Sequence, residues 1–198
     1  MPVLVVITDP GATEADFEAV FAYLTSIDET FSTYKDSSEI MRINRGEIVE
    51  RDYSDDVKEV FRLSEETKTE TAGYFDIGAN GMLDPSGLVK GWAIHNAAEL
   101  LRARGRANFF VDIGGDVQAH GVNAEGRAWT VGIRDPFSSE HKIVKRLRLR
   151  DMGIATSGTY LRGQHIWNPD ERSRAVARPK NSRMPRSDSL IDWKPLNA

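Results

Sequence analysis

The chain has 198 residues, 40% of them hydrophobic, so it is long enough to form one domain with a sizeable core. Its formal net charge of −4 provides no overall basic field for nucleic acid or an anionic membrane, which favours a small molecule or a protein as partner. The sequence contains no cysteine, which excludes disulfides, thiolate metal sites and cysteine nucleophiles.

The first element expected is a buried strand over residues 1–7, an apolar run that is far too short for a transmembrane helix. The run lacks the basic flank of a signal peptide. We therefore expect a cytoplasmic protein with no membrane segment in this chain, unless an export or lipoprotein signal was removed.

Three helices are expected next. The first begins at Thr13, because Asp16 three residues later completes a pattern that resembles a capping box. The second begins near Ser54, where carboxylates in the first turn favour the positive end of the helix dipole, and the third runs from about Gly91 to Gly105. The residues expected to face inward are Phe17, Val20, Phe21 and Leu24 in the first helix, Val57, Val60 and Phe61 in the second, and Ile94, Ala97, Ala98 and Leu101 in the third.

Strand candidates follow in close succession, at residues 108–113, 117–122, 128–133, 146–150 and 153–156. Short turns between them favour antiparallel pairing, and helices early with strands late indicate the α+β class. We expect a single domain over residues 1–169, with a mostly antiparallel sheet and packed helices. A Pro- and Arg-rich tail of uncertain structure would follow over residues 170–198.

Three glycine-containing stretches could each carry chemistry or be purely structural. Residues 73–91 open into a helix beside Lys90, which suits an anion site, but their spacing matches no standard phosphate loop. Residues 111–116 end a strand in paired glycines, which would let a ligand approach the backbone or simply form a hairpin turn. Residues 154–160 place hydroxyl groups at a strand end, as a ligand contact or as a cap.

The order of the motifs narrows these alternatives. The chain contains, in sequence, Phe31-Ser32-x-Tyr34, Ser38-Glu39-Ile40-x-Arg42-x-Asn44, Gly73-x-Phe75-Asp76, Leu83-Asp84 with Gly91, Gly114-Gly115-Asp116, Thr156-Ser157-Gly158 and His165-Ile166-x-Asn168-Pro169. This combination closely resembles the ApbE-type FAD:protein FMN transferases over roughly residues 3–169. The resemblance implies an α+β fold that holds FAD, cleaves its pyrophosphate and transfers FMN to a threonine of a target protein. It also implies Mg²⁺ as cofactor.

The resemblance implies roles for individual residues around the flavin and the rest of FAD. Tyr34 would lie beside the flavin ring, unless it is a half-buried core tyrosine. Phe75 and Asp76 would lie in the loop that lines the flavin, unless Phe75 is only a core residue. Asp84 and Lys90 would bind FAD, although Asp84 could only shape its Asp-Pro turn and Lys90 could be a solvated lysine at a helix start.

Further roles concern the metal, the cleft floor and proton transfer. The backbone oxygen of Gly87 would bind the metal, and Gly114, Gly115 and Asp116 would form the floor of the cleft. Thr156 and Ser157 would contact the ligand through their hydroxyl groups, with Ile166 also at the FAD site. His165 would be the base that deprotonates the acceptor threonine, and its ordinary pKa suits that role.

The sequence also departs from the family pattern. Asn168 stands where the family has an aspartate, and Asp188 and Asp192 lie in a segment unlike the family's metal-binding motif. The chain is also short at both ends relative to that pattern. We therefore expect an incomplete metal site, which leaves a non-catalytic FAD-binding protein as the alternative to a transferase.

Overall fold

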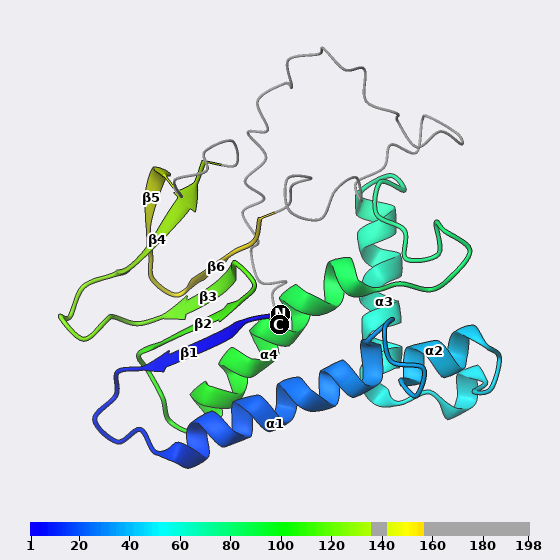
Figure 1. The fold of residues 1–198 in the computed structure, drawn as a ribbon, viewed down its shortest axis with the longest axis horizontal. Coiled ribbons are helices and arrows are strands. Elements are labelled where there is room, and N and C mark those ends of the chain that lie inside the picture. Colours follow the sequence, from blue (N-terminus) through cyan, green and yellow to red (C-terminus); the bar gives the residue numbers. More distant parts are fainter. Residues whose placement is uncertain (136–141, 157–198) are drawn as a thin grey trace, which may run out of the picture.

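The computed structural model describes residues 1–135 and 142–156 (Figure 1). Over these residues the fold is α+β, as expected, with helices early and strands late. The elements are β1 (Val3–Ile7), α1 (Glu14–Phe31), α2 (Glu39–Asn44), the short 3₁₀ helix η1 (Glu50–Asp52), α3 (Asp55–Glu70), α4 (Ser86–Ala103), β2 (Phe109–Ile113), β3 (Asp116–His120), β4 (Trp129–Arg134), β5 (Ile143–Leu149) and β6 (Met152–Ile154).

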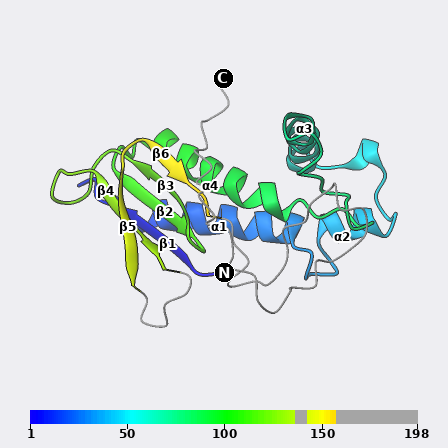
Figure 2. The same cartoon turned by 90° about the horizontal axis from the view of Figure 1, so that it is seen from above.

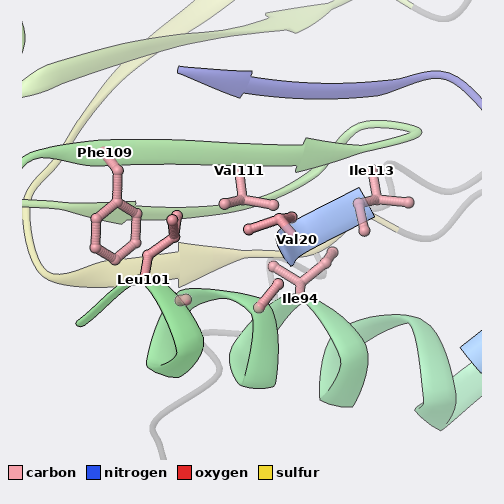
Figure 3. Packing of buried hydrophobic residues seen from close by; sticks show 8 residues of the cluster. Val20, Ile94, Leu101, Phe109, Val111 and Ile113 are labelled. Carbon is pink, nitrogen blue, oxygen red and sulfur yellow. The ribbon is translucent and has the colours of Figure 1, made fainter. Parts of the chain in front are cut away.

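Every strand pairing in the described residues is antiparallel. Four strands form one sheet in the order β1-β2-β3-β6, and β4 and β5 form a separate hairpin. The side chains of β2 alternate in burial, so Phe109, Val111 and Ile113 share one face of the sheet. Figure 3 shows these residues packed against Val20 of α1 and Ile94 and Leu101 of α4. On the opposite face the hairpin covers β3 and β6 through Trp129 and Leu149.

A second core lies beyond the sheet, where α1 and α4 continue toward α2 and α3 (Figures 1 and 2). There Phe31 of α1 meets the Trp92 ring of α4 edge-on, with ring centroids 5.9 Å apart. The buried members of this second core are Ile27, Phe31, Ile43, Val57, Val60, Val89 and Ala93. Helices α1 and α4 therefore contribute to both cores and connect them.

The expected helix starts at Thr13 and Ser54 are confirmed. The Thr13 amide donates to Asp16 Oδ2 at 2.8 Å, and the Ser54 hydroxyl accepts from the Val57 amide at 3.3 Å. Asp16 is buried and also pairs with Arg104 at 2.8 Å, so the carboxylate joins the start of α1 to the end of α4. The hydrogen bond from the Thr13 amide and, to a smaller extent, the one from Arg104 hold the pKa of the Asp16 carboxyl below its usual value.

Several boundaries differ from those expected. Helix α4 begins at Ser86 and not near Gly91, because the Asp84-Pro85 turn already starts the helix. Strand β1 is only partly buried, because it forms an edge of the described sheet, and Leu4 is 53% exposed. Helix α2 was not expected as a helix. None of the helices in the described ranges has the length and apolar character needed to cross a membrane.

Candidate functional site

The centre of the candidate site is the junction of α4, the β2–β3 turn and the end of β6. Asp116, the first residue of β3, is 7% exposed and occupies this junction. Its Oδ2 lies 2.6 Å from Nζ of Lys90 on α4, and its Oδ1 accepts from the Thr156 amide at 3.0 Å. One carboxylate therefore binds two segments that are distant in sequence. Lys90 is not a solvated lysine, because its side chain is only 18% exposed.

The β2–β3 turn places two glycines, which have no side chains of their own, at this junction. Gly114 and Gly115 have φ values of +59° and +92°, in the region that favours glycine. The Gly115 amide donates to Asp112 Oδ1 at 2.8 Å, and a Cβ added to Gly115 would lie 3.9 Å from Thr156 Oγ1. The turn is a hairpin turn, as one alternative held, and it also lies beside Thr156.

A second group of expected site residues surrounds the first turn of α4. Asp84 is exposed, and its Oδ1 accepts from the Ser86 amide at 3.0 Å, so the carboxylate shapes the Asp-Pro turn while staying open to solvent. The Phe75 ring lies against the same turn, because a Cβ added to Gly87 would be 3.1 Å from Phe75 Cε2. Lys90 follows Gly87 by three residues on α4 and so connects the two groups.

Asp76 is held by two partners. Its Oδ2 lies 2.9 Å from Lys68 Nζ on α3, and its Oδ1 accepts from the Gly78 amide at 2.9 Å. The hydrogen bond from Lys68, and then the one from Gly78, lower the pKa of the Asp76 carboxyl. Lys68 was not anticipated, because it carries no motif and its partner is defined only by how the loop folds back on α3.

Tyr34 lies in the segment between α1 and α2 and is 97% exposed. The alternative of a half-buried core tyrosine is therefore wrong. An exposed aromatic ring can stack on a planar ligand, so its proposed place beside a flavin stays a prediction.

The remaining expected residues cannot be placed. Ser157, His165 and Ile166 lie outside the described residues. Within residues 1–135 and 142–156, no group of three or more His, Asp or Glu side chains gathers in a way that could hold a metal ion. The described candidates for metal binding are the Asp84 carboxylate and the Gly87 carbonyl.

Comparison with known proteins decides the family. A family model described as the ApbE family matches residues 2–82 and 78–185. The chain belongs to the ApbE family. The resemblance inferred from the order of motifs is thus confirmed.

Two relatives of this ApbE chain are named FAD:protein FMN transferase. The one from Vibrio cholerae is 31% identical over 110 residues, which cover 52% of this chain and 31% of the relative. The one from Haemophilus influenzae is 35% identical over 79 residues, which cover 39% of this chain and 23% of the relative. The aligned parts of the chain thus span less than a third of these relatives.

Solved structures show the same fold. The flavin transferase ApbE from Vibrio cholerae superposes with a TM-score of 0.66 at 20% identity, covering 80% of this chain and 73% of that one. The ApbE protein of Thermotoga maritima gives a TM-score of 0.69 at 21% identity, with 80% and 67% covered. The α+β architecture of this chain is therefore the ApbE fold.

Proposed function

We propose that this chain binds FAD and acts as an FAD:protein FMN transferase on a threonine of a target protein. In that reaction the threonine oxygen bonds to the phosphorus on the FMN side, the bond from this phosphorus to the bridging oxygen breaks, and AMP leaves. The threonine proton passes to a base, for which the sequence offers His165.

The observation that carries the proposal is the junction of Lys90, Asp116 and Thr156 beside the glycine turn. It places the Lys90 ammonium group, paired with Asp116, beside glycine backbone where three segments of the chain meet. A pyrophosphate needs positioning and neutralisation of charge more than covalent help, and Lys90 is the cation that this junction offers. Tyr34 and Phe75 would then serve the flavin end of the molecule.

The described residues fit Mg²⁺ in part. The Asp84 carboxylate and the Gly87 carbonyl are oxygen donors, the type that this cation prefers, and they flank one turn at the start of α4. Bound Mg²⁺ would neutralise charge on the pyrophosphate. Further ligands would have to come from residues beyond those described.

One observation favours a second candidate function, a non-catalytic FAD-binding protein on the same scaffold. Asn168 replaces an aspartate of the family pattern, and an amide cannot supply the negative charge that a carboxylate brings to a metal. Binding of FAD is common to both candidates, and only transfer separates them.

Fluorescence titration with FAD and with FMN tests the binding. We expect tighter binding of FAD, because Lys90 and the glycine turn suit the diphosphate and adenosine part that FMN lacks. Binding of neither flavin would remove the flavin assignment, and equal binding of both would contradict the role given to Lys90 and the glycine turn.

Transfer is tested by intact mass after incubation with FAD, Mg²⁺ and a threonine-containing target. A transferase adds the mass of FMN to the target, and chelation of Mg²⁺ prevents the addition. His165→Ala is the control variant, for which we expect nearly unchanged FAD binding and a loss of transfer of roughly 10²-fold or more. FAD binding without any transfer by the unaltered chain would support the non-catalytic candidate.

A further inference from the structure

The motif from Ser38 to Asn44 has no part in the function proposed above, yet it forms an anchored helix. The Ser38 hydroxyl donates to the Ser32 carbonyl at 2.8 Å, just past the end of α1, and accepts from the Met41 amide at 3.2 Å. The next residue, Glu39, accepts from the Ser54 amide at 2.7 Å, at the start of α3. Helix α2 is thus tied to the helices on both sides of it.

Asn44, the last residue of α2, reaches into the loop of the candidate site. Its Nδ2 donates to the Leu83 carbonyl at 3.0 Å, and its Oδ1 accepts from the Leu83 amide at 2.8 Å, across thirty-nine positions of sequence. One carboxamide therefore satisfies both backbone groups of a single residue. A primary amide can donate and accept in this way from two separate atoms, whereas an ionised carboxylate of similar size can only accept.

The residue held by Asn44 leads directly into the candidate site. Leu83 precedes Asp84. The Asp84 amide donates to the Ile77 carbonyl at 2.8 Å, and the Asp84 carboxylate accepts from the amide of the first residue of α4. With Leu83 fixed on one side and α4 on the other, the Asp84 carboxylate and the Gly87 carbonyl have little freedom to move. A loop that is ordered before binding loses less conformational entropy when the ligand arrives.

We propose that Asn44 is a positioning residue, which holds the segment Leu83–Gly87 in the conformation that binds FAD and does so without touching the ligand. The inference rests on the proposed function, because it names the residue that prepares the same site. Its effect on FAD should therefore pass through Asp84.

The test compares Asn44→Ala with a matched variant at Asn108, which directly precedes β2. Asn108 makes the same kind of link, since its Oδ1 accepts from the Val122 amide at 2.9 Å and its Nδ2 donates to Asp9 at 3.1 Å. Both variants should lose stability in urea. Only Asn44→Ala should weaken FAD binding, by roughly tenfold, which is the size of effect expected for about one lost hydrogen bond at a partly buried partner. Equal weakening in Asn108→Ala would overturn the inference.

A double variant shows whether Asn44 acts through Asp84. On the background of Asp84→Ala, the change Asn44→Ala should weaken FAD binding by less than about threefold, because the group that it positions is already gone. The same tenfold loss on both backgrounds would mean that Asn44 acts independently of Asp84, contrary to the inference. If Asn44→Ala does not fold, Asn44→Asp replaces it, since it keeps the acceptor for the Leu83 amide and loses the donor.

Hydrogen exchange supplies a readout that needs no FAD. The amide of Leu83 should exchange faster in Asn44→Ala, and that of Val57 in α3 should not change beyond the general loss of stability. Unchanged exchange at Leu83 would contradict the inference even if FAD binds. If the unaltered chain binds no FAD while Leu83 exchange still rises in the variant, the proposed function is wrong. The result would then show only that Asn44 holds the loop at Leu83.

Discussion

At the scale of single residues, the ion pair of Lys90 and Asp116 is the feature that most distinguishes the site. Both side chains are largely buried, at 18% and 10% exposure, so each ion has lost much of its hydration. Such a pair gains little stability over an apolar pair, but removing one partner leaves a buried charge without compensation. The pair therefore constrains which residues the junction tolerates.

We expect Lys90→Met to lower the free energy of unfolding by about 3 kcal/mol, because it leaves the Asp116 carboxylate unpaired. Urea denaturation measures the change. The matched control is Lys58→Met on α3, which removes an exposed ion pair between Lys58 and Asp55 at 3.7 Å. This change should lower the free energy of unfolding by less than about 1 kcal/mol. Adding Asp116→Asn to Lys90→Met should recover most of the loss, since no unpaired charge remains. No recovery in the double variant would show that the Lys90 stem, and not its charge, stabilises the junction.

At the scale of elements, α4 matters most, because its first turns carry the expected FAD and metal contacts and its later turns pack on the sheet. Two glycines stand in this helix in different surroundings. A Cβ added to Gly91 would meet no atom within 4 Å, whereas one added to Gly87 would press on the Phe75 ring at 3.1 Å.

The two glycines give a paired prediction. Gly91→Ala should raise the free energy of unfolding by about 0.5–1 kcal/mol, because alanine loses less backbone entropy in a helix and has open space here. Gly87→Ala should raise the free energy of unfolding by less or not at all, because the Phe75 ring would have to move to make room for the added methyl group. The urea midpoints of the two variants, compared with that of the unaltered chain, measure these changes in stability. A larger gain at Gly87 would mean that the Phe75 ring moves freely.

At the scale of the whole molecule, the sheet core and the second core share α1 and α4. Val20 and Ile94 belong to the first, and Phe31 and Ala93 on the same two helices belong to the second. Neither core can lose its packing without exposing helices that the other one needs. The described part of the chain should therefore unfold as a single cooperative unit.

This expectation can be tested with one truncation in each core. Val111→Ala in β2 and Val57→Ala in α3 each remove buried atoms and should each lower stability by about 2 kcal/mol. Each should shift one common transition, with hydrogen exchange in β2 and α3 reporting the same free energy of opening. Two separate transitions, each sensitive to only one substitution, would show that the cores unfold independently.

The sequence by itself determined the features that depend on neighbours a few positions away. The helix starts at Thr13 and Ser54 were predictable because a cap bonds to an amide within its own first turn, and the glycine turn because its residues alone favour positive φ. The order of motifs also identified the family. Only the tertiary structure paired Lys90 with Asp116, Lys68 with Asp76 and Asn44 with Leu83. These partners lie on different segments, and no local periodicity encodes which segments meet, because that depends on how both cores pack around α1 and α4.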